Sequence, residues 1–206
     1  MEKRIFIRCL CQHIGRHIGF LLNVIQKPYI RLLFWLKAVN VGAGCKFYGI
    51  PYVHICKSGK IQIGKKCTFR SRECSNHMGL NHRCILSVTY TEKCKDAKLI
   101  IGNQCGFSGV TIWCFKEIII GNNVRVGANT IIMDGDAHDD DPRTTPPEAI
   151  RIEDNVFIGA NCIIKKGVII GANSVIGMNS VVTKNIPANV VAVGVPAKVI
   201  REINVI

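Results

Sequence analysis

The sequence predicts an all-β fold, a parallel β-helix whose coils are built from six-residue units. Aliphatic residues recur at every sixth position over one long stretch, at Ile152, Ile158, Ile164, Ile170, Ile176 and Val182. The fourth residue after each of these is also small or apolar: Val156, Cys162, Val168, Ser174, Ser180 and Ile186. A helix would need an apolar spacing near 3.6 and an alternating strand a spacing near 2, whereas a strict six-residue period is typical of a β-helix.

Each hexapeptide supplies one short strand and one turn, and three hexapeptides close a triangular coil of 18 residues. Because no single coil can bury its own apolar face, the coils must stack with their strands in parallel. Glycine directly follows the aliphatic residue in three of the six units, and asparagine stands in four turns, at Asn155, Asn161, Asn173 and Asn179. Both residue types adopt positive φ at low cost, so we expect tight turns there.

Length and composition indicate one globular domain, since the chain has 206 residues of which 48% are hydrophobic, with a mean hydropathy of +0.23. The net charge of +13 favours an anionic partner. No helix-turn-helix, RNP or zinc-finger pattern is present, and much of the excess charge lies in the first 40 residues. A nucleic-acid-binding or scaffold protein is therefore the weakest alternative, and nucleic acid is not an expected partner.

The 11 cysteines do not indicate a disulfide framework. Three of them, Cys45, Cys67 and Cys105, occupy the same place in a repeated [VI]-G-x-x-C-x-F frame, the inward position that Cys162 occupies later in the chain. Small thiols pack well in a core. Their number is odd, there is no C-x-x-C, and no signal peptide is evident, so we expect free thiols and a cytoplasmic location.

Residues 1–40 form a separate segment with seven basic side chains against Glu2 alone, a net charge of +6. Its apolar runs are shorter than the roughly 20 residues that a membrane span requires. The favoured interpretation is a helical cap over the first coil. The alternative is a basic amphipathic element in peripheral contact with the inner face of a membrane.

The repeat region extends over residues 41–187, with a carboxyl-terminal cap at 188–206 and insertions among the early coils. Val41 and Ile63 are 22 residues apart, one coil plus four, whereas Ile63 and Ile101 are 38 apart, which we interpret as two coils plus two. Residues 70–84 break the aliphatic pattern. Residues 133–149 are polar and contain three prolines, so they are expected to form a loop on a rigid scaffold, where chemistry is often placed.

The stretch from Ile152 to Ile203, ending NIPANVVAVGVPAKVIREI, resembles the carboxyl-terminal half of the hexapeptide-repeat acyltransferases, especially the maltose, galactoside and polysaccharide O-acetyltransferases. The resemblance implies a left-handed parallel β-helix, a homotrimer, acetyl-CoA as acyl donor and no metal. It also implies O-acetylation of a carbohydrate hydroxyl, in surface polysaccharide or lipopolysaccharide synthesis. N-acetylation of a nucleotide-linked aminosugar is the alternative within this class.

His138, in GDAHDDD, stands where this family carries its catalytic histidine. Acetyl transfer to a hydroxyl needs a base near pH 7, and imidazole suits that task. Either Asp134 or Asp136 is expected to hold the second ring nitrogen. Ala160 matches the family position whose backbone N–H stabilises the oxyanion of a directly attacked thioester.

The resemblance also implies where the coenzyme and the acceptor bind. Backbone contacts to the coenzyme are expected near Ala160, Gly177, Thr183 and Lys184, and charged contacts to its phosphates from Lys166, Lys198 and Arg201. An aromatic face with a nearby hydroxyl suits a sugar ring, so the expected acceptor-binding residues are Ser108, Trp113 and Phe115.

A γ-class carbonic anhydrase is the main alternative within the same fold. His77 and His82 have the H-x4-H spacing that its zinc site would need. A third histidine is expected about two coils upstream, and that position holds Val41.

Overall fold

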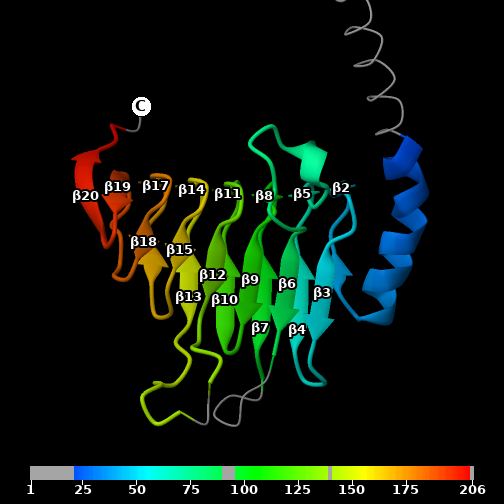
Figure 1. Cartoon of the computed structure of the whole chain (residues 1–206), viewed down its shortest axis with the longest axis horizontal. Helices are drawn as coiled ribbons and strands as arrows, with labels where there is room; N and C mark the ends of the chain where they lie inside the picture. The colour runs from blue at the N-terminus through cyan, green and yellow to red at the C-terminus, as the bar shows by residue number, and fades with distance from the viewer. Residues whose placement is uncertain (1–20, 90–95, 139–140, 205–206) are drawn as a thin grey trace, which may run out of the picture.

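The computed structural model describes residues 21–89, 96–138 and 141–204, and its strands form three sheets around one core (Figure 1). We call these sheets A, B and C, in the order in which the chain meets them. Sheet A has six strands: β1 (Asn40–Val41), β4 (Lys60–Ile63), β7 (Lys98–Ile101), β10 (Glu117–Ile120), β13 (Ile150–Ile152) and β16 (Ile169–Ile170).

Sheets B and C complete each coil. Sheet B has eight strands: β2 (Lys46–Tyr48), β5 (Thr68–Arg70), β8 (Gly106–Ser108), β11 (Arg125–Val126), β14 (Phe157–Ile158), β17 (Val175–Ile176), β19 (Val190–Gly194) and β20 (Ala197–Glu202). Sheet C has six strands: β3 (Tyr52–Ile55), β6 (Ile85–Val88), β9 (Thr111–Cys114), β12 (Ile131–Met133), β15 (Ile163–Ile164) and β18 (Val181–Val182).

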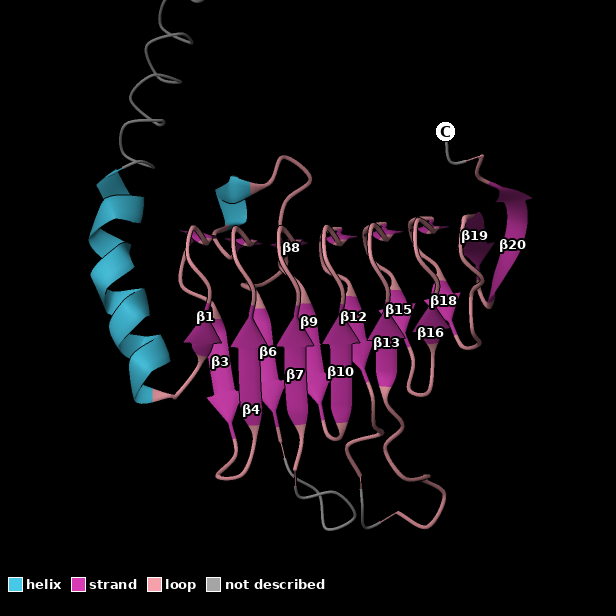
Figure 2. Ribbon diagram, turned by 180° about the vertical axis from the view of Figure 1, so that it is seen from behind, coloured by secondary structure: helices cyan, strands magenta, loops and turns pink. Residues whose placement is uncertain are grey.

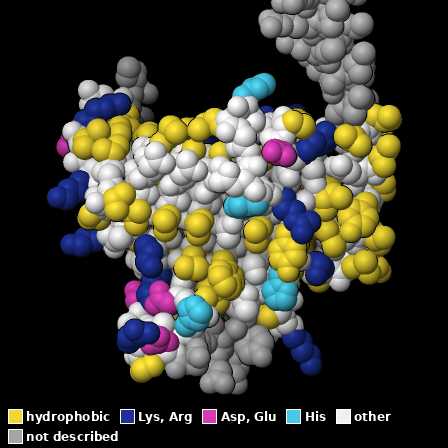
Figure 3. All heavy atoms as spheres, in the orientation of Figure 1, with side chains coloured by type: hydrophobic (Ala, Val, Ile, Leu, Met, Phe, Trp, Pro, Cys, Tyr) yellow, Lys and Arg dark blue, Asp and Glu magenta, His cyan; other side chains and the backbone are white. Residues whose placement is uncertain are grey.

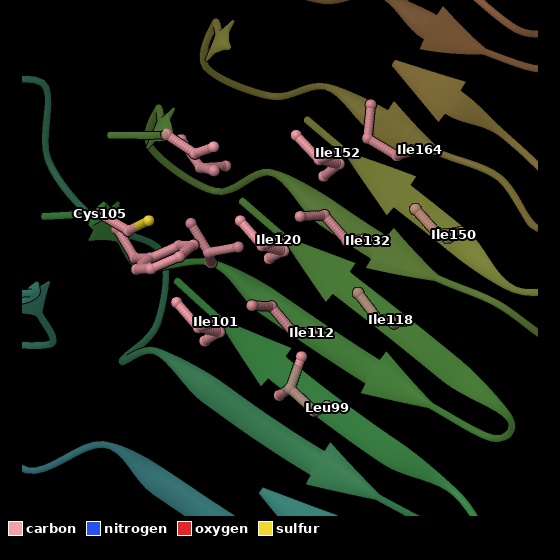
Figure 4. Packing of buried hydrophobic residues seen from close by; sticks show 14 of the residues in the cluster. Leu99, Ile101, Cys105, Ile112, Ile118, Ile120, Ile132, Ile150, Ile152 and Ile164 are labelled. Carbon is pink, nitrogen blue, oxygen red and sulfur yellow. The ribbon is translucent and has the colours of Figure 1, made fainter. Parts of the chain in front are cut away.

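The chain is a left-handed parallel β-helix, as the hexapeptide period and the family resemblance predicted. The strands of successive coils pair in parallel; Ile152, for example, pairs with Ile120 and with Ile170. The last strand, β20, instead pairs antiparallel with β19. Both predicted inward sets are buried, since Ile158 and Ile164 of the first set and Val156 and Cys162 of the second are all 0% exposed. Figure 4 shows buried aliphatic side chains of sheets A and C in the same core, among them Ile152 and Ile164.

The predicted turn asparagines adopt the left-handed conformation. Asn155, Asn161, Asn173 and Asn179 have φ between 55° and 60°. At the corner between sheets A and B, asparagine side chains also form a ladder. The side-chain amide of Asn155 donates to the side-chain oxygen of Asn173 at 3.0 Å, and that of Asn173 donates to Asn189 at 2.8 Å. The corner residues thus satisfy one another along the stack.

The interpretation of the 38-residue spacing was wrong. Ile63 pairs directly with Ile101, so one coil, not two, separates them. The extra residues leave the coil at two corners, as residues 71–84 between β5 and β6 and residues 89–97 between β6 and β7. The first of these contains the short 3₁₀ helix η1 (Glu73–Ser75). The spacing between aliphatic residues gives only a number of residues. It does not distinguish one additional coil from two insertions at the corners whose total length is similar.

A helix over residues 21–36 lies across the open end of the first coil (Figures 1 and 2). Two of its own residues, Ile30 and Phe34, are buried in the core. The Phe34 ring meets the edge of Phe47 at 5.2 Å, and the rings of Phe47, Phe69 and Phe107 stack through three coils at 5.2 and 5.0 Å. The repeated aromatic positions therefore form one column that the helix closes. No helix in the part of the chain described here is long and apolar enough to cross a membrane.

Candidate active site

The predicted catalytic loop follows β12 and returns to the stack at β13, at the corner between sheets C and A, which we call the C–A corner (Figure 1). One coil earlier the same corner is a tight turn at Phe115 and Lys116, and one coil later it is a tight turn at residues 165–168. The long loop thus lies between two short turns, and both of them hold it.

Asp134 fastens the loop to the preceding turn. Its carboxylate is fully buried and accepts hydrogen bonds from the backbone N–H groups of Phe115, Lys116 and Glu117 at 2.6, 3.0 and 2.7 Å. Burial raises the pKa of this carboxyl, while the three amide donors act in the opposite direction. Both oxygens are engaged by backbone, so Asp134 does not orient His138, contrary to one of the two predicted options.

Asp136 fastens the loop to the following turn. Its carboxylate forms an ion pair with Lys166, which also donates to the Thr145 carbonyl at 3.1 Å. The hydrogen bond from Lys166 holds the pKa of Asp136 below its usual range. Among the described residues no hydrogen bond joins Asp136 to the His138 ring, so its orienting role stays a prediction, and Lys166 is already engaged with the loop.

The backbone at Ala137 turns His138 outward. Ala137 has φ of 62°, a left-handed conformation that is uncommon for a residue with a Cβ and that commonly marks a functional constraint. The next residue, His138, has an exposed side chain, and its carbonyl accepts hydrogen bonds from Asp141 N at 3.2 Å and Thr144 Oγ1 at 2.8 Å. Among the described residues none forms a hydrogen bond with the imidazole, and the side chain is open to solvent.

Ala160 lies at the other edge of sheet C, at the corner between sheets B and C, which we call the B–C corner. Among the described residues none accepts a hydrogen bond from its backbone N–H. The left-handed turn at Asn161 and the strand β15 separate it from Lys165 at the C–A corner. The expected base and the expected oxyanion donor therefore lie at opposite edges of sheet C, and a single chain does not bring them together.

The expected coenzyme-binding residues fall into three places. Gly177 stacks one coil beyond Ala160 at the B–C corner, and Thr183 and Lys184 stack beyond Lys166 at the C–A corner. Lys198 and Arg201 are exposed on β20, the antiparallel edge strand of sheet B. No single surface of one chain joins all three groups.

The expected acceptor residues are not equally accessible. Ser108 lies at the B–C corner and Trp113 near the C–A corner, where its indole N–H donates to Thr89 Oγ1 at 3.1 Å. The Trp113 and Phe115 ring centroids are 4.9 Å apart. Phe115 is only 3% exposed, and a Cβ at Gly135 would come within 2.7 Å of its ring. Phe115 therefore supports the loop from below, and its expected contact with a sugar is not available.

His77 and His82 lie in the insertion between β5 and β6, at the B–C corner. His82 Nδ1 is 2.8 Å from the Arg83 carbonyl oxygen. Residues 21–89, 96–138 and 141–204 contain no group of three His, Cys, Asp or Glu side chains placed to hold a metal ion.

Sequence reasoning missed the three features that hold the loop: the Asp134 cap, the Asp136–Lys166 pair and the left-handed Ala137. The repeated acidic residues of MDGDAH were visible, but their partners lie 17 to 30 residues away in the sequence. Only stacking of the coils brings them together.

Comparison with known proteins agrees with this architecture. The family described as "Hexapeptide repeat of succinyl-transferase" matches residues 117–135 and 149–184. Galactoside O-acetyltransferase of Escherichia coli (strain K12) is 47% identical over 91 residues, which are 42% of this chain and 45% of that protein. A 2,3,4,5-tetrahydropyridine-2,6-dicarboxylate N-acetyltransferase of Staphylococcus aureus (strain JH9) is 39% identical over 82 residues, 40% of this chain and 32% of that protein.

This chain thus matches less than half the length of these relatives. Among solved structures, AntD, an N-acyltransferase from Bacillus cereus in complex with dTDP and 3-hydroxybutyryl-CoA, superposes with a TM-score of 0.63 at 17% identity. The superposition covers 84% of this chain and 88% of that one. At this identity the likeness concerns the fold.

Proposed function

Since the later coils of this chain match the hexapeptide-repeat family and a galactoside O-acetyltransferase, we propose that it transfers an acetyl group from acetyl-CoA to a carbohydrate hydroxyl. The observation that carries the proposal is the exposed His138 imidazole on a loop fastened by Asp134 and Asp136. A general base must be held in place and must still reach a substrate. This loop meets both requirements.

In this proposal His138 takes the proton of the acceptor hydroxyl while the hydroxyl oxygen attacks the acetyl carbonyl carbon. Negative charge develops on the carbonyl oxygen, and the unpaired Ala160 N–H of a neighbouring copy donates a hydrogen bond to it. The C–S bond then breaks, and the imidazolium returns its proton to the leaving thiolate. The histidine ends the cycle neutral, and no acyl group is attached to the protein.

A homotrimer would bring the two halves of this site together. The outward residues of sheet C form a row in register that is apolar except for Thr111 and can pack against the next copy: Tyr52, Ile85, Thr111, Ile131, Ile163 and Val181. A cyclic arrangement around an axis parallel to the coils would place the C–A corner of one chain beside the B–C corner of the next. The coenzyme would lie in that groove, near Gly177, Thr183 and Lys184, with Lys198 and Arg201 for its phosphates.

Mixing two inactive variants tests the shared site. His138→Ala removes the base, and Ala160→Pro removes the backbone N–H of the expected oxyanion donor. The residue after Ala160, Asn161, has φ of 55°, and a turn with positive φ at that place accepts proline at the position before it. Random mixed trimers should regain up to about a quarter of the wild-type rate, because a competent site needs one intact half from each of two copies. Thermal melting should first show that each variant is folded. Full inactivity of the mixture would contradict a site shared between chains.

The acceptor class is tested directly with purified protein and radiolabelled acetyl-CoA. We expect label on surface polysaccharide fragments or on galactosides, the second of which the name of the Escherichia coli relative indicates for that protein. Label on a nucleotide-linked aminosugar instead would favour N-acetylation; AntD, described as an N-acyltransferase, was solved in complex with one such sugar, dTDP-4-amino-4,6-dideoxyglucose. We place the enzyme in the cytoplasm, in surface polysaccharide or lipopolysaccharide synthesis, a location supported by eight free cysteines among the described residues.

A further inference from the structure

The helix over residues 21–36 is apolar on both of its faces. With about 100° between successive residues, Ile30 and Phe34 point at the first coil, and a second apolar set points the opposite way. The outward set is exposed: Leu21 58%, Val24 44%, Ile25 61%, Leu32 52%, Trp35 76% and Leu36 67%. The cap therefore covers the core and also leaves an apolar surface that no described residue covers.

The positive charge of the chain lies at the same end of the molecule. Residues 1–72 contain 14 Lys and Arg and only Glu2 as an acid, which equals the whole net charge of +13. Residues 73–206 contain 13 of each sign and sum to zero. Ten of the 14 basic residues lie in described positions 21–72, on the helix and the first two coils. The coils that carry the candidate site are thus electrically balanced, and the capped end is cationic.

A groove between the helix and the first coil combines both properties. Its volume is about 850 Å³, and its lining includes Lys27, Arg31 and Lys46 beside Trp35, with no acidic residue. Figure 3 shows hydrophobic side chains gathered at the helix end of the molecule, with Lys and Arg side chains beside them. An apolar helix face flanked by basic side chains and an aromatic residue fits the boundary between lipid headgroups and acyl chains.

We propose that this outward helix face docks the protein on an anionic membrane surface, with Trp35 and its apolar neighbours inserted and the basic groove over the headgroups. The helix lies across the end of the coil stack, so the coils would stand away from the bilayer (Figures 1 and 2). In a cyclic trimer with parallel coil axes, all three helices would lie at one end and would bind together. Nucleic acid would be bound by the basic side chains alone and would leave the apolar helix face exposed to water, so the apolar face favours a lipid surface as the partner.

The test uses the full chain and vesicle flotation, without acetyl-CoA, so that it is independent of the proposed reaction. Vesicles of phosphatidylcholine with about 30% phosphatidylglycerol are compared with pure phosphatidylcholine. We expect the protein to float with the anionic vesicles and its tryptophan emission to shift to shorter wavelength, a shift that Trp35→Phe removes. Trp35→Glu and Leu36→Glu should each lower the bound fraction at least about tenfold.

Met78→Glu is the matched control, because Met78 is 61% exposed on the insertion between β5 and β6 and its substitution changes the charge equally. It should bind as the wild type does. The proposal is overturned if the wild-type protein does not float, or if both helix variants float as well as the control. It is also overturned if the protein does not bind vesicles and the helix variants instead abolish a concentration-dependent self-association. A protein that binds only nucleic acid, with binding unchanged in the helix variants, would overturn it as well.

Discussion

The turn after β15 and the loop after β12 both lead from sheet C to sheet A, yet their backbones are held in different ways. In the short turn, the N–H groups of Lys165 and Gly167 donate to carbonyls of neighbouring segments, those of Val182 and Glu148. The long loop shares the Gly167–Glu148 backbone bond with that turn, and two side-chain contacts fasten it besides: Asp134 on one neighbouring turn and Lys166 from the other. The stack therefore holds its regular turns, whereas the loop is held by a few contacts. Its chemistry and its stability can be changed separately.

The largest effect is expected from His138→Ala, which should separate chemistry from structure most clearly. Loss of a positioned general base lowers the rate by about 10²–10⁴-fold. The side chain is exposed, so the free energy of unfolding should change by less than about 0.5 kcal/mol. Acetylation kinetics, acetyl-CoA binding and urea unfolding would be measured together. A variant that retains most of its turnover would contradict the assignment of the base.

Asp134→Ala should have the opposite profile, with a large effect on stability. Removal of the carboxylate leaves three backbone N–H donors in the preceding turn without their acceptor. Unsatisfied buried donors cost about 1–3 kcal/mol each, so a loss of about 3–5 kcal/mol in the free energy of unfolding is expected, allowing for relaxation. Asp141→Ala, which removes a carboxylate paired with Arg143 of the same loop, should lower the free energy of unfolding much less. Equal losses would show that Asp134 does not fasten the loop to the stack.

Asp136→Asn and Lys166→Met test whether Lys166 fastens the loop or binds the coenzyme. If it fastens the loop, each variant should lower the rate by about tenfold with an unchanged KM for acetyl-CoA, and the double variant should be no worse. If Lys166 binds a phosphate, only Lys166→Met should raise that KM.

The same pair predicts a pH dependence. Because Lys166 lowers the pKa of Asp136, the ion pair is fully formed above the usual carboxyl pKa of about 4 and is lost as the pH falls through the lowered value. The defects should therefore not vary with pH between about 6 and 9.

The smallest effect is expected at Ala137. Its left-handed strain of about 1 kcal/mol would be relieved by glycine, and the greater freedom of glycine in the unfolded chain offsets this by about 0.5–1 kcal/mol. Ala137→Gly should therefore change the free energy of unfolding by less than about 0.5 kcal/mol, whereas Ala137→Val should cost about 1–2 kcal/mol. Urea unfolding of both variants checks this. Equal stabilities of the two would mean that φ is not constrained at this position.

The carboxyl-terminal coils were predictable residue by residue. The six-residue period identified Ile158 and Cys162 as inward positions, and the turn asparagines were identified by their tolerance of positive φ. Each of these properties depends on residues within one coil, so it is visible in the local sequence. The early coils were harder, because the pairing of Ile63 with Ile101 depends on two insertions that the period cannot separate.

By itself, the sequence determined the fold class, the inward positions, the turns and the presence of a histidine loop, because a strict period leaves one way to bury the apolar face. Only the tertiary structure decided what holds His138 in place. Asp134 meets the backbone of Phe115 to Glu117, and Asp136 meets Lys166, because stacking joins residues of successive coils. The tertiary structure likewise placed Ala160 at the opposite edge of sheet C from His138, since the triangular section fixes which corner each residue occupies.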